Sequence, residues 1–311
     1  MTSGDLDREH GRDPGTTLAR SGVTSRRWVE AHESSSLMAA GAMADALTRS
    51  GLGINDLDAL IVSAVAPEQP MPTTAILTLA ALDAAGGGCD AFDVNASCVG
   101  FLTGLRIAQD GVDAGRWERV GVVSTEIASK GLDHRHTEAS ALFGDGAGGV
   151  VVGRSGDDQH SAILASHSAV WPEAAAACRI DAGGTRFNPM TPPDHPGAYL
   201  FSMDGAALLR AVARHLPGFL REVQARAGIA LSEIDLVIPH QASAVGLRYL
   251  RSFVPGERVI DILGDHGNQV SASIPTALDH AVTSGRLQRG MTVLLLGTGA
   301  GLTLAATVVR Y

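Results

Sequence analysis

The sequence predicts an α/β protein made of two similar halves. Residues 53–62 resemble residues 228–238, because both segments follow a helical stretch and give a turn, an acidic residue and a buried strand. Residues 119–126 resemble residues 292–299, because both are apolar strands that lead toward a glycine-rich turn. Short β-branched strands that alternate with longer helical stretches indicate largely parallel sheets buried on both faces.

The end of each half is repeated as well. In both halves a further apolar strand follows the glycine-rich turn, at 148–153 and at 302–309. The repeat places the junction within residues 153–162 and divides the chain into residues 1–155 and 156–311. Residues 165–200 are rich in Gly and Pro, so we expect a long loop there that borders the substrate site. A merely variable surface loop is the alternative.

The composition limits the classes of function. The chain has 311 residues, a formal net charge of −9 and three cysteines. An acidic chain does not suit a nucleic-acid partner, and so few cysteines do not indicate a disulfide framework. No apolar run reaches the roughly 18 residues of a membrane span, and residues 1–20 lack the apolar stretch of a signal peptide. The histidines show no metal-ligand spacing. We therefore expect a cytoplasmic protein with no metal.

One cysteine stands where a strand turns into a helix. Residues 91–94 form an apolar run and a helical pattern starts at Phe101, so Cys98 falls between the two elements. The free N–H groups and positive end of a helix favour thiolate over thiol, and a thiolate is a covalent nucleophile. Buried cysteines that only pack are common, so an inert Cys98 is the alternative at this point.

Two distant segments place further polar residues beside predicted strand and helix ends. His240 follows the apolar run 234–238, and ligands bind at the strand ends of α/β sheets. Asn268 lies in a glycine-containing loop before a helical pattern that starts at Pro275. Taken singly, a structural histidine and a turn asparagine explain these positions equally well.

Together, Cys98, His240 and Asn268 resemble the active-site set of the thiolase superfamily, and specifically of the β-ketoacyl-acyl carrier protein synthase III family. The resemblance covers nearly the whole chain. Further segments look like signatures of that family in its usual order and spacing: Phe143-Gly-Asp-Gly-Ala-Gly148, His240-Gln-Ala, Gly267-Asn268, Ser273-Ile-Pro275 and Gly297-Thr-Gly-Ala-Gly301. The combination is highly specific, although no single segment is.

The resemblance implies a thiolase-like fold of five layers, αβαβα, in which the two halves are the duplicated units. The chain departs from the family at one point. The family opens with a strand and a glycine turn before the segment that resembles Asp5–Arg8, and this sequence does not contain them. We therefore expect a thiolase-like fold that lacks the usual first strand.

The resemblance also implies a reaction in two halves. Cys98 takes an acyl group from a thioester, while the backbone N–H groups of Cys98 and Gly301 stabilise the oxyanion. A malonyl thioester, malonyl-acyl carrier protein in the family, then loses CO2, and His240 and Asn268 hydrogen-bond to the enolate oxygen. The resulting carbanion attacks the acyl group and yields a β-ketoacyl thioester, in fatty-acid initiation or a specialised metabolite pathway. No cofactor is required.

The resemblance places substrate contacts at Arg20, Met71, Phe143, Gln241 and Ser243. The acyl donor is expected to be a coenzyme A or acyl-carrier-protein thioester. The family commonly has a Trp that stacks on adenine, and Thr16 stands at that position here, which should weaken coenzyme A binding.

A homodimer is expected, with Met71 of one subunit helping to close the acyl pocket of the other, where the family often has Phe. Because Met is flexible, we expect a longer or more variable acyl chain to be accepted. An ordinary core Met is the alternative.

Other functions stay open at this point. An acyltransferase of the same fold would move the acyl group to an alcohol or amine without condensation, but it needs no enolate site such as Asn268. A non-catalytic partner subunit would not need Cys98. The apolar setting of His240 disfavours a thiol hydrolase.

Two features have competing interpretations. Glu126 lies at a strand end and either faces the pocket or bonds to loop amides as a structural carboxylate. The glycine runs at 144–148 and 297–301 suggest nucleotide binding, but strands rather than helices follow both runs. Close backbone packing is the better interpretation of these glycines.

Overall fold

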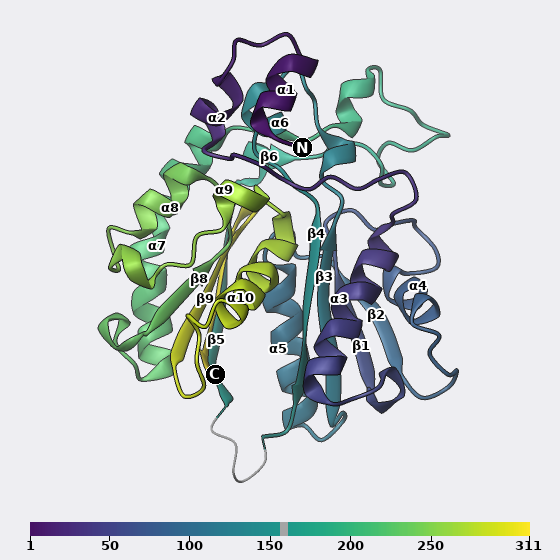
Figure 1. Cartoon of the computed structure of the whole chain (residues 1–311), viewed down its shortest axis with the longest axis vertical. Helices are drawn as coiled ribbons and strands as arrows, with labels where there is room; N and C mark the ends of the chain where they lie inside the picture. The colour runs from purple at the N-terminus through teal and green to yellow at the C-terminus, as the bar shows by residue number, and fades with distance from the viewer. Residues whose placement is uncertain (156–160) are drawn as a thin grey trace.

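The chain folds into two four-stranded sheets, one from each half of the sequence (Figure 1). The computed structural model describes residues 1–155 and 161–311. The N-terminal sheet has the order β2-β1-β3-β4, with strands β1 (Ala59–Ser63), β2 (Asp90–Val94), β3 (Arg119–Glu126) and β4 (Gly146–Gly153). The C-terminal sheet has the order β5-β10-β9-β8, with strands β5 (Ala162–Ala174), β8 (Leu236–Pro239), β9 (Thr292–Gly299) and β10 (Gly301–Arg310).

The inner strands run parallel, and the last strand of each half turns back. β1 pairs in parallel with β2 and β3, and β8 pairs in parallel with β9. β4 pairs antiparallel with β3, and β10 pairs antiparallel with both β9 and β5. Only Ala300 separates β9 from β10, and so short a turn requires antiparallel pairing. The prediction of largely parallel sheets is therefore wrong for β4, β5 and β10.

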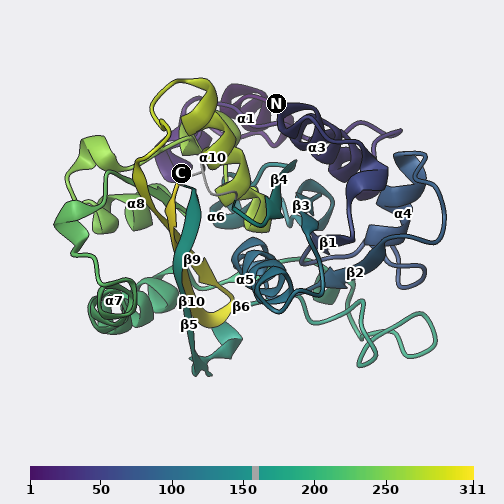
Figure 2. The ribbon, with the colours of Figure 1, turned by 90° about the horizontal axis from the view of Figure 1, so that it is seen from below.

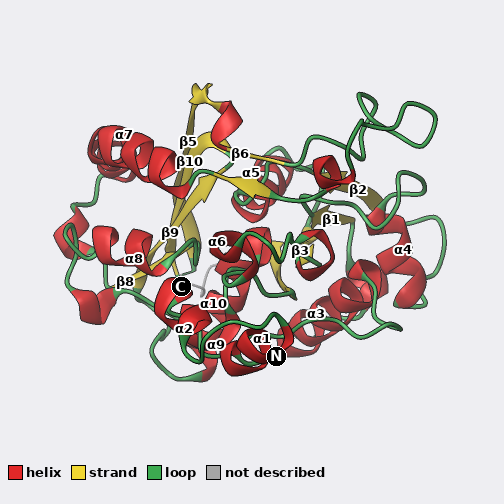
Figure 3. Cartoon of the chain, turned by 90° about the horizontal axis from the view of Figure 1, so that it is seen from above, coloured by secondary structure: helices red, strands yellow, loops and turns green. Residues whose placement is uncertain are grey.

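Two helices fill the space between the sheets, as Figures 2 and 3 show. α5 (Gly100–Asp113) and α10 (Ser273–Thr283) pack in one core cluster with Ile61 of β1 and Leu295 of β9. In β1 the neighbours Leu60 and Val62 face the opposite way, into a second cluster under the outer helices. Because both faces of the strand are buried, β1 is an unbroken apolar run rather than an alternating one.

Further helices cover the outer face of each sheet and complete the five layers αβαβα that the resemblance implied (Figure 2). On the N-terminal sheet they are α3 (Ser35–Ser50) and α4 (Thr74–Ala81), and on the C-terminal sheet α7 (Gly205–Ala227) and α8 (Ala244–Leu250). The fold class is thus confirmed.

Short elements gather over one end of the two sheets (Figure 1). They are α1 (Ser3–Glu9), α2 (Thr16–Ser21), α6 (Thr137–Ser140), α9 (Leu263–His266) and the two-stranded sheet of β6 (Cys178–Arg179) and β7 (Ser202–Met203). Single 3₁₀ turns are η1 (Ile54–Asp56), η2 (Ser129–Gly131), η3 (Ala175–Ala177), η4 (Pro196–Tyr199), η5 (Leu231–Glu233), η6 (Gly256–Arg258) and η7 (Val270–Ala272).

The structure corrects the loop expected at 165–200. β5 extends to Ala174, because it pairs along nearly its whole length with β10. The irregular part of the segment follows η3, and only the short strand β6 and the turn η4 interrupt it. The Gly and Pro residues of 183–197 lie in this irregular part, whereas the apolar residues before them belong to the sheet.

Two other expectations concern the missing first strand and the junction between the two halves. Within residues 1–58, all of which are described, the β contacts are limited to an isolated bridge between Thr2 and Ser25. The junction predicted between 155 and 156 borders residues 156–160, which lie outside the described residues. Within the described ranges, no helix combines the length and the apolar character that crossing a membrane requires.

Candidate active site

Cys98 lies where the chain passes from β2 to α5, as the sequence predicted. The residue before it, Ser97, has a φ of 51°, so the backbone turns sharply here. The backbone N–H groups of Cys98 and Ala300 lie close enough to the Cys98 sulfur to lower the pKa of its thiol. Since Ala300 is the turn between β9 and β10, the sulfur lies at the junction of the two halves.

The surroundings of the sulfur oppose ionisation. Cys98 is half-buried as a residue, but protein encloses its thiol. Burial raises the pKa of the Cys98 thiol far above its usual range, and Cys178 and Glu126 raise it further because their negative forms repel a thiolate. The two N–H groups lower the pKa by less. Backbone N–H groups favour the thiolate, as the sequence predicted, but loss of hydration outweighs them.

His240 follows the end of β8, next to the strand that leads to Ala300. Pro239 pairs with Leu296 of β9, and the His240 N–H donates to the Leu296 carbonyl at 2.8 Å. Burial lowers the pKa of the imidazole to about 4. His240 is therefore neutral at neutral pH and keeps one ring donor and one ring acceptor. Its Nδ1 is buried and has no hydrogen-bond partner in the described part of the chain.

Asn268 is held beside His240 by a short hydrogen-bonded path. Its Nδ2 donates to the Ala242 carbonyl at 3.3 Å, and the Ala242 N–H donates to the His240 carbonyl at 2.8 Å. Its Oδ1 accepts from the Val270 N–H at 2.8 Å. An amide nitrogen has two hydrogens, so one stays available for a ligand. The structure thus links Cys98, His240 and Asn268 through Ala300, β9 and Ala242.

Tight backbone packing explains the glycines at 144–148. A Cβ on Gly144 would lie 2.2 Å from the His266 carbonyl oxygen, and a Cβ on Gly146 would lie 2.0 Å from Gln269 Nε2. Gly267 has a φ of 68°, which a residue with a side chain rarely adopts. The glycine run therefore packs against the segment that carries Asn268, and the predicted close packing is confirmed.

Three predicted substrate contacts have structural partners of their own. Gln241 is fully buried, with its Nε2 donating to Pro239 and Ile260 carbonyls and its Oε1 accepting from the Ile262 N–H. Ser243 caps α8 by accepting from the Gly246 N–H at 3.1 Å. Phe143 is buried edge-on against Phe201, with ring centroids 4.8 Å apart.

Of the other predicted site residues, Arg20 and Met71 are exposed, and Gly301 belongs to a strand. Arg20 is an exposed residue in the last turn of α2. Met71 lies between β1 and α4 with 82% of its surface exposed, so within one chain it is not a core residue. Gly301 has a φ of 77° and pairs with Ala174 of β5.

Sequence reasoning missed two residues beside the nucleophile. Ala300 belongs to a recognised segment, in which the resemblance singled out only the next residue, Gly301, as an oxyanion donor, whereas the Ala300 N–H lowers the pKa of the Cys98 thiol. Cys178 bears on the pKa of Cys98, and η3, which precedes it, packs on the turn at Gly301, with the Ala175 Cα 4.0 Å from where a Gly301 Cβ would lie. Proximity between residues so far apart in sequence leaves no local signal.

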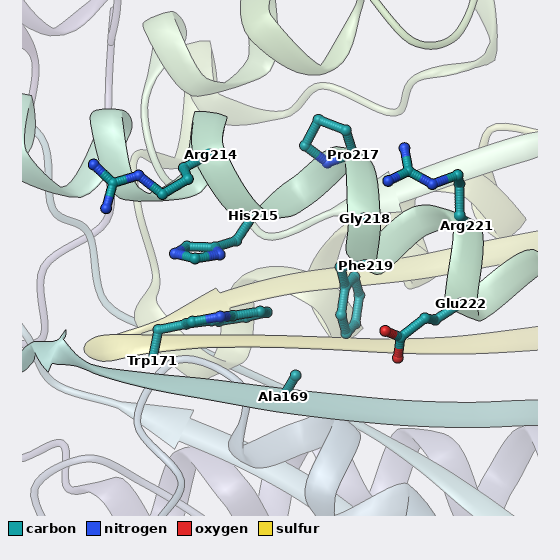
Figure 4. A pocket seen from close by; sticks show the side chains of 9 residues that line it. All are labelled: Ala169, Trp171, Arg214, His215, Pro217, Gly218, Phe219, Arg221 and Glu222. Carbon is teal, nitrogen blue, oxygen red and sulfur yellow. The ribbon is translucent and has the colours of Figure 1, made fainter.

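Two surface cavities lie elsewhere. One of about 240 Å³ lies between α7 and β5, where the His215 ring stacks on Trp171 at 4.4 Å (Figure 4). The other, about 540 Å³, is lined by residues around Cys89 and Trp117 at the start of β2. The three catalytic candidates line neither cavity. In the described ranges, no three His, Cys, Asp or Glu side chains gather to hold a metal ion.

Comparison with known proteins decides the family. The family model described as 3-oxoacyl-[acyl-carrier-protein (ACP)] synthase III matches residues 92–170, and the model of its C-terminal part matches residues 224–311. The β-ketoacyl-[acyl-carrier-protein] synthase III of Aquifex aeolicus is 34% identical over 100% of this chain and 95% of its own. The chain belongs to the β-ketoacyl-acyl carrier protein synthase III family.

Other members of the family agree in sequence and in fold. The synthase III of Symbiobacterium thermophilum is 32% identical over 100% of this chain and 94% of its own. The crystal structure of 3-oxoacyl-(acyl carrier protein) synthase III from Pseudomonas aeruginosa has a TM-score of 0.88 at 28% identity, covering 100% of this chain and 93% of that chain. The first matched range contains Cys98, and the second contains His240 and Asn268.

Proposed function

We propose that this chain is a condensing enzyme that loads an acyl group onto Cys98 and joins it to a malonyl thioester with loss of CO2. The carrying observation is that hydrogen bonds join His240 to β9 and, through Ala242, to Asn268, while Ala300 at the end of β9 lies close to the Cys98 sulfur. Membership of the synthase III family supports the same reaction. We assign the second substrate to malonyl-acyl carrier protein and the pathway to fatty-acid initiation or a specialised metabolite.

In the first half-reaction, the Cys98 sulfur attacks the carbonyl carbon of the acyl thioester. The departing thiolate takes up the proton that Cys98 loses, so charge balances over the step. The N–H groups of Cys98 and Ala300 both lie close to the sulfur that the acyl carbon joins, and we assign the oxyanion to this pair in place of Cys98 and Gly301.

In the second half-reaction, the malonyl thioester loses CO2 and its electron pair moves to the thioester oxygen. A ring N–H of the neutral His240 and the free amide hydrogen of Asn268 stabilise this enolate. The carbanion then attacks the acyl carbon, and the Cys98 sulfur leaves.

The acyl donor is a coenzyme A or acyl-carrier-protein thioester in this proposal. Arg20 offers an exposed cation on α2 for the phosphate that both donors contain. Thr16, in the position of the family's aromatic residue, does not provide a stacking surface. The three free cysteines suit a reducing compartment, and we place the enzyme in the cytoplasm.

The test is a panel of acyl-coenzyme A and acyl-carrier-protein thioesters, with intact mass as the readout. We expect a single acyl adduct, followed by release of CO2 when malonyl-acyl carrier protein is added. An adduct that forms while no malonyl thioester ever releases CO2 would favour the acyltransferase alternative. The absence of an adduct with every donor would contradict both functions.

A further inference from the structure

Glu126 is a buried carboxyl group that the proposed reaction does not use. It ends β3, is 3% exposed, and accepts three hydrogen bonds on a single oxygen. The donors to Oε1 are the Val65 N–H at 3.0 Å, the Ser271 Oγ at 2.5 Å and the Ser271 N–H at 3.4 Å. The other oxygen, Oε2, accepts none from the described residues, so it is the oxygen on which a proton can reside.

The partner of Glu126 belongs to the segment that carries Asn268. Ser271 lies in η7, directly after Val270, whose N–H is bonded to the Asn268 amide oxygen. The contact therefore joins β3 of the N-terminal half to the catalytic segment of the C-terminal half. The bonds from the Val65 and Ser271 N–H groups fit one of the two interpretations of Glu126, a structural carboxylate bonded to loop amides.

A row of buried hydroxyl groups extends from Glu126 to the base of α5. The Ser271 Oγ accepts from the Ser63 Oγ at 3.4 Å, and the Ser63 Oγ lies 2.5 Å from the Ser124 Oγ. All three serines are fully buried. A Cβ on Gly100 would lie 2.7 Å from the Ser63 Oγ, so the row runs directly beneath the first turn after Cys98.

Strand register brings Glu126 to the same edge as the nucleophile. Ser63 at the end of β1 pairs with Val94 of β2 on one side and with Ser124 of β3 on the other. These strands are parallel, so their carboxyl ends meet at one edge of the sheet. Cys98 follows β2 and Glu126 ends β3, on opposite sides of the serine row.

We propose that Glu126 is a positioning residue for the nucleophile, which sets the protonation of Cys98 by the charge of a carboxyl group that Ser271 holds in place. The proposal rests on Cys98 being the nucleophile of the proposed function. Neither half-reaction of the proposed function gives Glu126 a role, so the proposal goes beyond that function.

The charge of Glu126 changes the pKa of Cys98 in one direction. Burial raises the pKa of Glu126 to about 7, the bonds from Ser271 and Val65 lower it, and Asp145 raises it. Above that pH the carboxylate raises the pKa of the Cys98 thiol, and below it the neutral acid does not. Cys178, the other group whose negative form would raise the pKa of Cys98, is neutral there because its own pKa is about 11.

The experiment measures alkylation of Cys98 by iodoacetamide across the neutral pH range, with peptide mass separating Cys98 from Cys89 and Cys178. In the unmodified chain we expect the rise of the rate with pH to flatten near pH 7, where Glu126 ionises. In Glu126→Gln the flattening should vanish. The two rates should coincide at lower pH, and the variant should react several-fold faster at higher pH.

Ser271→Ala is the matched control, because it removes the hydroxyl donor and keeps the carboxyl group. The Ser271 bond lowers the pKa of Glu126, so the flattening should move to higher pH in this variant. Profiles of Glu126→Gln and the unmodified chain that superimpose would overturn the proposal. So would equal loss of reactivity at every pH in both variants, which indicates a purely structural role.

Alkylation needs no substrate, so its outcome is independent of the proposed reaction. An acyl adduct that maps to a cysteine other than Cys98 would instead contradict the proposed function and leave the alkylation result intact. The two failures are therefore distinguishable.

Discussion

The sulfur of Cys98 is the atom on which the proposed chemistry depends. Removing it in Cys98→Ala should leave the fold intact, because Ala fits the same turn, and should abolish the acyl adduct. Cys89→Ala is the matched control, since Cys89 precedes β2 by one residue and should not change acylation. Intact mass after incubation with the best donor of the panel measures both. An adduct that persists in Cys98→Ala would refute the assignment.

Asn268 should matter in one half-reaction and not in the other. Its free amide hydrogen faces a charge that exists only after CO2 has left. Loss of one such donor costs about 2.7–4 kcal/mol, or roughly 10²–10³ in rate. Asn268→Ala should therefore acylate at a near-normal rate and release CO2 from a malonyl thioester far more slowly. Rapid-quench acylation and CO2 release, measured separately, test the division. Equal losses in both would count against it.

At the scale of the element, the glycine run at 144–148 holds the Asn268 segment in place. Gly144→Ala would set a methyl group against the His266 carbonyl, where the available gap is 2.2 Å. The backbone must shift, so we expect a lower Tm together with slower CO2 release. Gly41→Ala in the exposed part of α3 is the control, because nothing lies within 4 Å of its Cβ.

The control should itself be stable. Replacing a helix-interior Gly with Ala favours the helix by about 0.5–1 kcal/mol, so Gly41→Ala should raise the Tm slightly and leave the rate unchanged. Thermal unfolding and CO2 release on the same samples separate the two variants. If Gly144→Ala behaves like Gly41→Ala, the close packing does not position Asn268.

At the scale of the whole molecule, the N-terminal half offers surface for a second copy. Met71 is 82% exposed, and β2, which precedes the nucleophile, is an edge strand of its sheet. The resemblance to the family places a subunit contact at this position, and the exposure of Met71 leaves it free to make one. We predict a two-fold dimer in solution, in which Met71 helps to close the partner's acyl pocket. Sedimentation measures the assembly, and a monomer would remove the shared pocket.

The acyl-chain profile tests Met71 itself. Met71→Phe puts a larger and stiffer side chain at the predicted contact, so we expect preference to shift toward shorter acyl groups. Acylation rates over a series of chain lengths, for the variant and the unmodified chain, give the profile. The exposed Met190, 89% accessible in the irregular segment, provides the matched control as Met190→Phe. An unchanged profile for Met71→Phe would exclude Met71 from the pocket.

The sequence by itself determined the features that depend on local order. Cys98 between a strand and a helix, His240 after an apolar run, and the repeated halves all follow from hydrophobic periodicity and motif spacing, which neighbouring residues fix. The structure keeps Cys98 between β2 and α5 and His240 after β8. The five layers came from the resemblance, because periodicity gives strands and helices but not their stacking.

Only the tertiary structure decided the features that join distant segments. β5 is a strand rather than a loop because β10 pairs with it. Ala300 comes close to the Cys98 sulfur because the turn after β9 brings the C-terminal half to the nucleophile. Burial raises the pKa of the Cys98 thiol because enclosure by protein removes water from it. Hydration and long-range contacts set these outcomes, and neither is encoded in the residues adjacent to Cys98.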